Sequence, residues 1–151
     1  MSECDNRSVG VLLFNEHNEL LLIERARFPF GYAAPAGHID EHGSPEQAAI
    51  EEVREETGLL IAKGSLQHVI RDRRIENRCR RQGGFYHDWD VFKTNQYQGT
   101  LQPSKDETNG AQWLSPERLQ ALADETRRAV PGVLGIEAVW LTFLEELGFI
   151  H

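Results

Sequence analysis

The residues from Pro35 to Leu59 constrain the fold of this chain more than any other stretch. Their second half predicts one helix, because Ser44 is a candidate N-cap, Pro45 occupies the first helical position and Gln47 completes a capping box. Gly58 stands where a left-handed C-terminal cap is expected, and no glycine or proline interrupts the residues between. We therefore expect a helix that begins and ends within this stretch.

The predicted helix carries four carboxylates within six residues. At about 100° per residue, one apolar side is shared by Ala49, Ile50 and Val53. Another side gathers Glu52, Glu55 and Glu56, with Glu51 beside Glu55 and Ala48 upstream. Like charges at these spacings repel each other, so this side is either a solvated acidic surface or a site for a hard divalent cation. The glycine-led loop before the helix favours the cation site, and the small Ala48 leaves room for an approaching group.

The stretch resembles the Nudix box, G-x5-E-x7-R-E-U-x-E-E-x-G-U, in which U is an aliphatic residue. Gly37 matches the opening glycine, and residues 52–59 match the whole closing run at the required spacing. Two positions depart from the pattern, since Gly43 replaces the first glutamate and Glu51 replaces the arginine. The resemblance implies an α/β class fold, a Nudix-like α/β/α sandwich around a mixed β-sheet, formed as a single domain over residues 1–151.

The resemblance also implies an activity, that of a Nudix hydrolase which cleaves a phosphoanhydride bond in a nucleoside diphosphate linked to another moiety. Such a pyrophosphatase depends on a divalent metal, Mg²⁺ or Mn²⁺, which polarises phosphoryl oxygens and acidifies bound water. The partner would be a small nucleotide-type molecule. The alternative is a Nudix-fold binding or regulatory module that recognises a nucleotide without hydrolysing it.

Site residues follow from the same resemblance. Glu52 and Glu56 match the principal metal ligands, Glu55 matches a further ligand or water contact, and the backbone carbonyl of Ala36 matches a ligand ahead of the box. Glu107, and after it Asp106, are candidates for a final catalytic acidic group, although both could equally be solvated loop charges. In the family the missing glutamate and arginine are thought to support the acidic cluster. Glu51 is therefore expected to have a supporting role, with recruitment as a ligand as the alternative.

Arginines are concentrated near the middle of the chain. Six of the 16 lysines and arginines lie within eleven residues, namely Arg71, Arg73, Arg74, Arg78, Arg80 and Arg81. This cluster is either a mobile, solvated loop or a set of phosphate contacts, because Arg pairs bidentately with phosphate. We expect Arg71 and Arg73, together with Arg25 and Arg27 near the end of an earlier strand, to bind substrate.

Composition limits the remaining possibilities. A length of 151 residues suits one domain, and a net charge of −8 at pH 7 argues against broad nucleic-acid binding. No apolar run suggests a membrane span, and the polar start suggests no signal peptide, so a cytoplasmic location is expected. Cys4 and Cys79 are expected to be reduced thiols and not a metal-binding pair.

Strands are predicted at residues 8–14, 19–24, 59–62, 65–70, 85–94 and 111–114, with a short segment within 96–101. The first two are expected to pair as a hairpin, and the continuous apolar run 20–23 suggests burial on both faces. His87 is expected to be a packed strand residue and not a ligand. Two more helices are predicted, one capped by Ser115 and one over 133–147, whose apolar stripe favours packing on the sheet over a homodimer contact.

Overall fold

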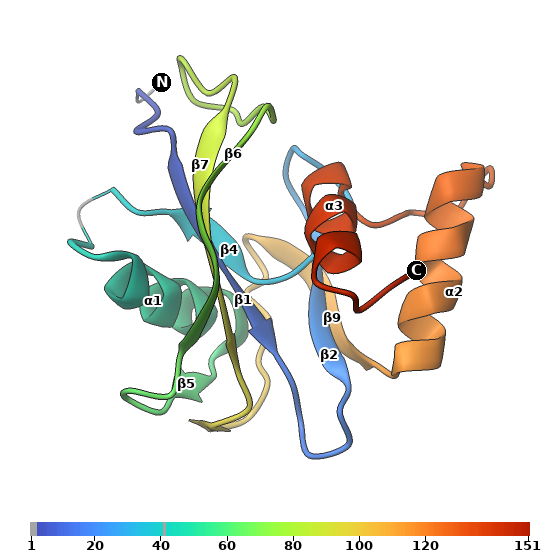
Figure 1. Cartoon of the computed structure of the whole chain (residues 1–151), viewed down its shortest axis with the longest axis horizontal. Helices are drawn as coiled ribbons and strands as arrows, with labels where there is room; N and C mark the ends of the chain where they lie inside the picture. The colour runs from blue at the N-terminus through green and yellow to red at the C-terminus, as the bar shows by residue number, and fades with distance from the viewer. Residues whose placement is uncertain (1–2, 41) are drawn as a thin grey trace.

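The computed structural model describes residues 3–40 and 42–151, and its strands form a layer between helices (Figure 1). The larger sheet has the strand order β4 (Ala36–His38), β1 (Arg7–Leu13), β7 (His87–Thr94) and β6 (Gln67–Ile75). β1 pairs in parallel with β7 and antiparallel with β4, and β6 is antiparallel to β7. The sheet is therefore mixed, as predicted.

A second sheet places β2 (Leu20–Arg25) between β3 (Tyr32–Ala33) and β9 (Thr108–Leu114), with both pairings antiparallel. A short pair joins β5 (Leu60–Ile61) to β8 (Tyr97–Gln98). β2 is buried on both faces, because Leu20 and Leu22 belong to one hydrophobic cluster and Leu21 belongs to the other. This confirms the reading of its continuous apolar run.

Helices cover both sides of the strand layer. α1 (Pro45–Thr57) lies on one side, and α2 (Pro116–Arg128) and α3 (Ala138–Glu146) lie on the other (Figure 1). One core cluster packs under α1 through Ala49 and Val53, and the other packs under α2 and α3 through Leu119 and Trp140. The α/β/α sandwich expected from the sequence is confirmed. Within the described residues, none of the helices is both long and apolar enough to cross a membrane.

The caps of α1 are those that the sequence predicts. The Ser44 side chain accepts a hydrogen bond from the Gln47 backbone N–H, and Gly58 ends the helix in the left-handed conformation with φ 77°. The position of Ala48 is a correction: it is fully buried in the core and does not border an open acidic face.

The predicted hairpin is wrong, since β1 and β2 belong to different sheets and are joined near the turn by one bridge between Phe14 and Leu20. The turn at residues 15–18 does form, with the Asn18 N–H donating to the Asn15 carbonyl at 3.1 Å. β2 separates from β1 because both of its edges are occupied, by β3 and by β9.

The largest differences from the predicted extents are in β6 and α3. β6 continues to Ile75, so the first arginines of the cluster lie on a strand and not in a loop. α3 begins at Ala138, because the backbone before it is used to pair with β3: the Tyr32 N–H donates to the Gly135 carbonyl at 2.9 Å, and the Glu137 N–H donates to the Tyr32 carbonyl at 2.9 Å.

Candidate metal and phosphate site

A cavity of about 260 Å³ opens where β4, the acidic side of α1, the end of β2 and the loop after β6 meet. Its acidic walls come from Asp40, Glu52, Glu56 and Glu107. Its basic walls come from Arg25, Arg27, Arg80 and Arg81. The rest of the lining is Phe28, Ala36, Gly37, His38 and Cys79. The cavity thus places carboxylates opposite guanidinium groups.

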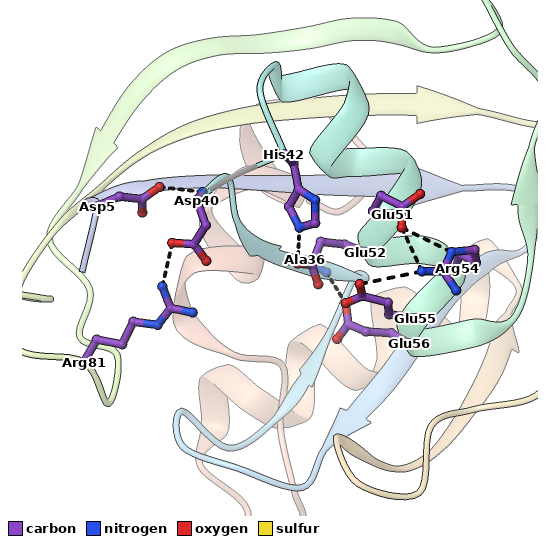
Figure 2. Close-up of polar contacts among 10 residues, drawn as sticks. All are labelled: Asp5, Ala36, Asp40, His42, Glu51, Glu52, Arg54, Glu55, Glu56 and Arg81. Atoms are coloured by element: carbon purple, nitrogen blue, oxygen red, sulfur yellow. Dashed lines mark hydrogen bonds and ion pairs between the residues drawn. The ribbon is translucent and has the colours of Figure 1, made fainter. Parts of the chain in front are cut away.

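Glu56 is the most enclosed of these carboxylates. It lies in the last turn of α1, is 4% exposed, and accepts a hydrogen bond from the Ala36 backbone N–H at 2.7 Å (Figure 2). Burial and the nearby charge of Glu52 raise the pKa of Glu56 well above its usual value. The helix and β4 are therefore joined through a buried carboxyl group.

Glu52 lies one helical turn earlier, directly against Gly37. A Cβ at position 37 would overlap the Glu52 carboxyl group, so any other residue there would displace that group from its place. Burial, followed by the charges of Glu55, Glu107 and Asp40, raises the pKa of Glu52 to about 8. Ionised Glu52 and Glu56 repel each other and are largely shielded from water. A proton on either group, or a cation bound by both, would reduce this unfavourable energy.

These residues fit a hard divalent cation. Among the described residues, no lysine or arginine lies at hydrogen-bond distance from the Glu52 or Glu56 carboxyl group, and clustered carboxylate oxygens are the ligands that Mg²⁺ and Mn²⁺ prefer. Glu52 and Glu56 would hold such an ion, with Glu107 and Ala36 at the same cavity wall.

Glu51 and Glu55 of α1 lie outside the cavity lining. Glu55 is exposed, and its carboxylate lies 3.8 Å from Nη2 of Arg54 (Figure 2). Glu51 pairs with the same guanidinium, which donates from Nη2 at 2.8 Å and from Nε at 3.2 Å. The structure thus turns Glu51 toward Arg54 on the outer side of the helix. Glu55 acts on Glu52 only through its charge.

Glu107 reaches the cavity from the other sheet. It directly precedes β9, and its backbone carbonyl accepts a hydrogen bond from the Ala26 N–H at 3.0 Å, next to the end of β2. Its charge contributes to the raised pKa values of both Glu52 and Glu56. Asp106, the second candidate, is exposed and is not among the lining residues.

The predicted arginines divide into two pairs. Arg25 and Arg27 line the cavity, and Nε of Arg25 donates to the Pro29 carbonyl at 2.7 Å. Arg71 and Arg73 lie on β6, away from it: Arg71 borders a separate hollow beside α1, and Arg73 pairs with Glu146 of α3 at 2.6 Å.

Arg80 and Arg81 were missed as site residues, although they belong to the same arginine cluster. Nη1 of Arg81 donates to Asp40 at 2.7 Å (Figure 2), and this contact lowers the pKa of Asp40. The sequence does carry a signal for them. The apolar residues at 69, 70 and 75 indicate a strand that extends to Ile75, which leaves Arg80 and Arg81 in the loop that follows.

The first departure from the box, Gly43, has a local explanation. Gly43 has φ 89°, a left-handed conformation that glycine adopts freely and a glutamate does not. Beside it, Nε2 of His42 lies 4.0 Å from the Glu52 carboxylate (Figure 2). The box pattern has a glutamate at position 43. In this protein the neighbouring residue, His42, brings an imidazole near the Glu52 carboxylate instead.

The NUDIX domain family matches residues 5–132 of the chain. The chain therefore belongs to the family of Nudix hydrolases. A relative in Pseudomonas aeruginosa (strain LESB58), named as the NAD-capped RNA hydrolase NudC, is 30% identical over 114 residues, which are 74% of this chain and 37% of that protein. The match to this chain spans 26% to 66% of the length of its curated relatives.

Solved structures support the fold. A MutT protein from Methanosarcina mazei Go1 superposes with a TM-score of 0.68 at 20% identity, covering 98% of this chain and 96% of that one. The NUDIX domain of Shewanella oneidensis NrtR, solved in complex with ADP ribose, superposes with a TM-score of 0.65 at 19% identity, covering 98% of this chain and 88% of that one. At these identities the likeness shows the Nudix fold.

Proposed function

We propose that this protein is a Mg²⁺- or Mn²⁺-dependent pyrophosphohydrolase that cleaves a phosphoanhydride bond in a nucleoside diphosphate linked to another moiety. The observation that carries the proposal is the convergence, in one cavity, of the carboxyl groups of the partly buried Glu52 and the buried Glu56 with four arginines. An acidic pair alone would repel a diphosphate, and arginines alone would bind it without activating water. Together they suit both partners of a metal–diphosphate complex.

Each wall of the cavity has a separate task. Glu52 and Glu56 would hold the divalent cation, which would polarise phosphoryl oxygens and lower the pKa of its bound water. Arg25, Arg27, Arg80 and Arg81 pair with phosphate oxygens and offset the charge that develops during cleavage. Glu107, which lines the cavity from the second sheet, is the proposed acceptor of a proton from the attacking water.

An aromatic ring at the cavity suggests how the nucleoside is held. Phe28 lines the cavity and is 45% exposed, and it meets Phe30 edge-to-face with ring centroids 6.4 Å apart. Bases stack on exposed aromatic rings with little sequence preference. The names of the relatives, an NAD-capped RNA hydrolase and an ADP ribose complex, fit a substrate in which a nucleoside diphosphate carries a second group.

The alternative is a binding or regulatory module that recognises the nucleotide without hydrolysis. The replacement of two box residues, by Gly43 and Glu51, is the observation that favours it. The carboxyl groups at the cavity are present in either case, so only turnover distinguishes the two.

The test is a hydrolysis assay with Mg²⁺ and with Mn²⁺ on nucleoside triphosphates, dinucleoside polyphosphates, nucleotide sugars, NAD and ADP ribose. We expect at least one compound to be cleaved at a phosphoanhydride bond, and Glu52→Gln to abolish that cleavage. Binding of a compound without cleavage above the Glu52→Gln background, across the whole panel, would support the regulatory module instead.

A further inference from the structure

Two cysteines and two histidines from four separate segments converge beside the cavity. Cys4 precedes β1, His38 ends β4, Cys79 lies in the loop after β6, and His87 begins β7. One potential ligand atom from each residue lies within 4.8 Å of all the others. Sγ of Cys4 lies 3.4 Å from Nε2 of His38, 3.3 Å from Nε2 of His87 and 3.7 Å from Sγ of Cys79.

These separations are close to the edges of a tetrahedral zinc site. With Zn–S near 2.3 Å and Zn–N near 2.0–2.1 Å, tetrahedral geometry places two sulfurs about 3.8 Å apart and a sulfur and a nitrogen about 3.6 Å apart. Ordinary hydrogen bonding accounts for the cluster less well. Hydrogen bonding alone would use Sγ of Cys4, a weak donor and a weak acceptor, for two imidazole nitrogens and a second sulfur at once.

The tautomer of His87 is set for ligation. Nδ1 of His87 lies 3.1 Å from Oδ1 of Asn77, and the same oxygen accepts a hydrogen bond from Nε1 of Trp89 at 3.3 Å. Because Oδ1 is an acceptor, Nδ1 carries the proton, and the lone pair of Nε2 faces the sulfur of Cys4. A ligating histidine is commonly oriented in this way by a hydrogen bond to its other ring nitrogen.

The backbone around the sulfurs is also fitted to them. The Asn6 N–H donates to Sγ of Cys4 at 3.3 Å, and the Cys79 N–H donates to the Gly84 carbonyl at 2.9 Å. A Cβ on Gly84 would overlap Sγ of Cys79, so a side chain at that position would move the sulfur. The loop after β6 therefore packs closely around Sγ of Cys79.

We propose that Cys4, His38, Cys79 and His87 bind one Zn²⁺ ion in a closed, structural Cys2His2 site. All four positions are supplied by the protein, which is the arrangement of structural zinc sites, and thiolate and imidazole ligands select zinc over Mg²⁺ or Mn²⁺. The site is therefore chemically distinct from the carboxylate cavity. Sequence spacing does not reveal it, because the partners of Cys4 lie 34, 75 and 83 residues away.

A bound zinc ion would hold in place the loop after β6, which carries Arg80 and Arg81. Cys79 is followed directly by Arg80 and Arg81, and His38 directly follows Gly37, which packs against Glu52. A zinc ion at this point would hold the arginine loop against β4, so that both walls of the cavity keep their spacing. This positioning role rests on the proposed function, but zinc binding itself does not.

Zinc binding is tested on untagged protein purified without chelators, by elemental analysis and by exchange with Co²⁺. We expect about one Zn²⁺ per chain, and after exchange the strong visible absorption of tetrahedral, thiolate-bound Co²⁺. Cys79→Ser and His87→Asn should each lose most of the zinc. His17→Asn, an exposed turn residue, and Glu52→Gln, in the carboxylate cavity, should both retain it.

A second measurement on the wild-type protein covers the case in which the cysteine variant does not fold. Titration with a mercurial reagent should release one Zn²⁺ as the two thiols react, and a zinc-sensitive dye reports the release. Zinc well below one per chain, a Cys4–Cys79 disulfide, or full zinc retention in folded Cys79→Ser would each overturn the proposal. None of these outcomes would affect metal-dependent hydrolysis at Glu52 and Glu56.

Discussion

The glutamates of α1 differ in environment although they are neighbours in the sequence. Glu56 is 4% exposed and bonded to the Ala36 N–H, the Glu52 side chain is 14% exposed, and the Glu55 side chain is 42% exposed. Burial of a carboxylate is costly without a compensating positive charge. We therefore expect the two less exposed members to depend on a cation, and the charge of the exposed member raises the pKa of Glu52.

Glu52→Gln is expected to stabilise the protein at pH 8 in buffer without Mg²⁺ or Mn²⁺. The pKa of Glu52 is raised to about 8 in the folded protein, so between its usual value and pH 8 the folded state holds a proton that the unfolded state loses. The free energy of unfolding therefore falls as the pH rises through this range. A glutamine does not ionise, so the variant should not lose this stability as the pH rises.

Urea unfolding at pH 5 and pH 8 measures the effect. The stabilisation by Glu52→Gln should be greater at pH 8 than at pH 5 by at least about 1 kcal/mol, since one pKa unit corresponds to about 1.4 kcal/mol. Glu117→Gln, at an exposed position in the first turn of α2, should show the same small effect at both pH values. An effect of Glu52→Gln that is independent of pH would contradict the account.

Glu51→Gln is expected to retain most of kcat and of the metal affinity. Glu51 bonds to Arg54 on the outer side of α1 and does not line the cavity. Steady-state kinetics on the substrate found in the panel would check this. A loss of kcat of about tenfold or more would show instead that Glu51 has been recruited to the site.

The sequence predicted which residue types form the site, but not which of them are buried. Helical spacing placed three glutamates on one side, and the box resemblance assigned them to metal. The burial of Glu56 depends on how β4 docks against α1, and that contact involves residues 20 positions apart in the chain. Ala48 was misplaced for the same reason, since the depth to which the helix packs is a tertiary property.

At the scale of elements, the loop between β4 and α1 adopts a conformation suited to its own sequence. Gly43 has φ 89°, with open space where a Cβ would point. Restoring the box residue with Gly43→Glu should therefore cost about 1–2 kcal/mol of stability through backbone strain alone.

Gly43→Ala is the matched control for Gly43→Glu, because it introduces the same backbone strain without a carboxylate. The two variants should lose the same free energy of unfolding in thermal or urea denaturation. A Gly43→Glu variant as stable as the wild type would mean that the missing glutamate, and not the conformation of the loop, is what distinguishes this box.

The loop after β6 is expected to contribute more to substrate binding than the strand itself. Arg81 lines the cavity beside Asp40, whereas Arg73 pairs with Glu146 on α3. Arg81→Gln should lower kcat/KM by about tenfold or more, as expected for the loss of a charged phosphate contact. Arg73→Gln should leave it near the wild-type value, and the reverse order of effects would contradict this assignment.

Elements with local signals were predicted well, and pairings between distant segments were not. The caps of α1 and α2 are encoded within a few residues, and Ser44 and Ser115 both accept the predicted backbone hydrogen bonds. The partner of β1 is β7, with Ser8 opposite Trp89, and nothing in either strand specifies the other. The hairpin of β1 and β2 was therefore a reasonable local inference that the tertiary structure overrides.

At the scale of the whole molecule, an acidic protein presents a positively charged wall to an anionic ligand. The net charge is −8, yet Arg25 and Arg27 from the end of β2 meet Arg80 and Arg81 from the loop after β6 across the acidic residues of α1. The sandwich brings these segments together because its two sheets meet beside β4 (Figure 1). The resemblance to the box predicted the sandwich, but not which arginines it would bring to the cavity.

The central claim is that the buried carboxyl groups of α1 form a divalent-metal site, and Mn²⁺ titration by calorimetry tests it most directly. Glu56→Gln keeps an oxygen that can accept the Ala36 N–H, so the fold should be preserved while the charge is lost. We predict that Mn²⁺ binds Glu56→Gln at least about tenfold more weakly than the wild type, a difference of about 1.4 kcal/mol. Glu51→Gln, the control on the outer side of the same helix, should bind Mn²⁺ nearly as the wild type does. Unchanged Mn²⁺ affinity in a folded Glu56→Gln variant would contradict the account.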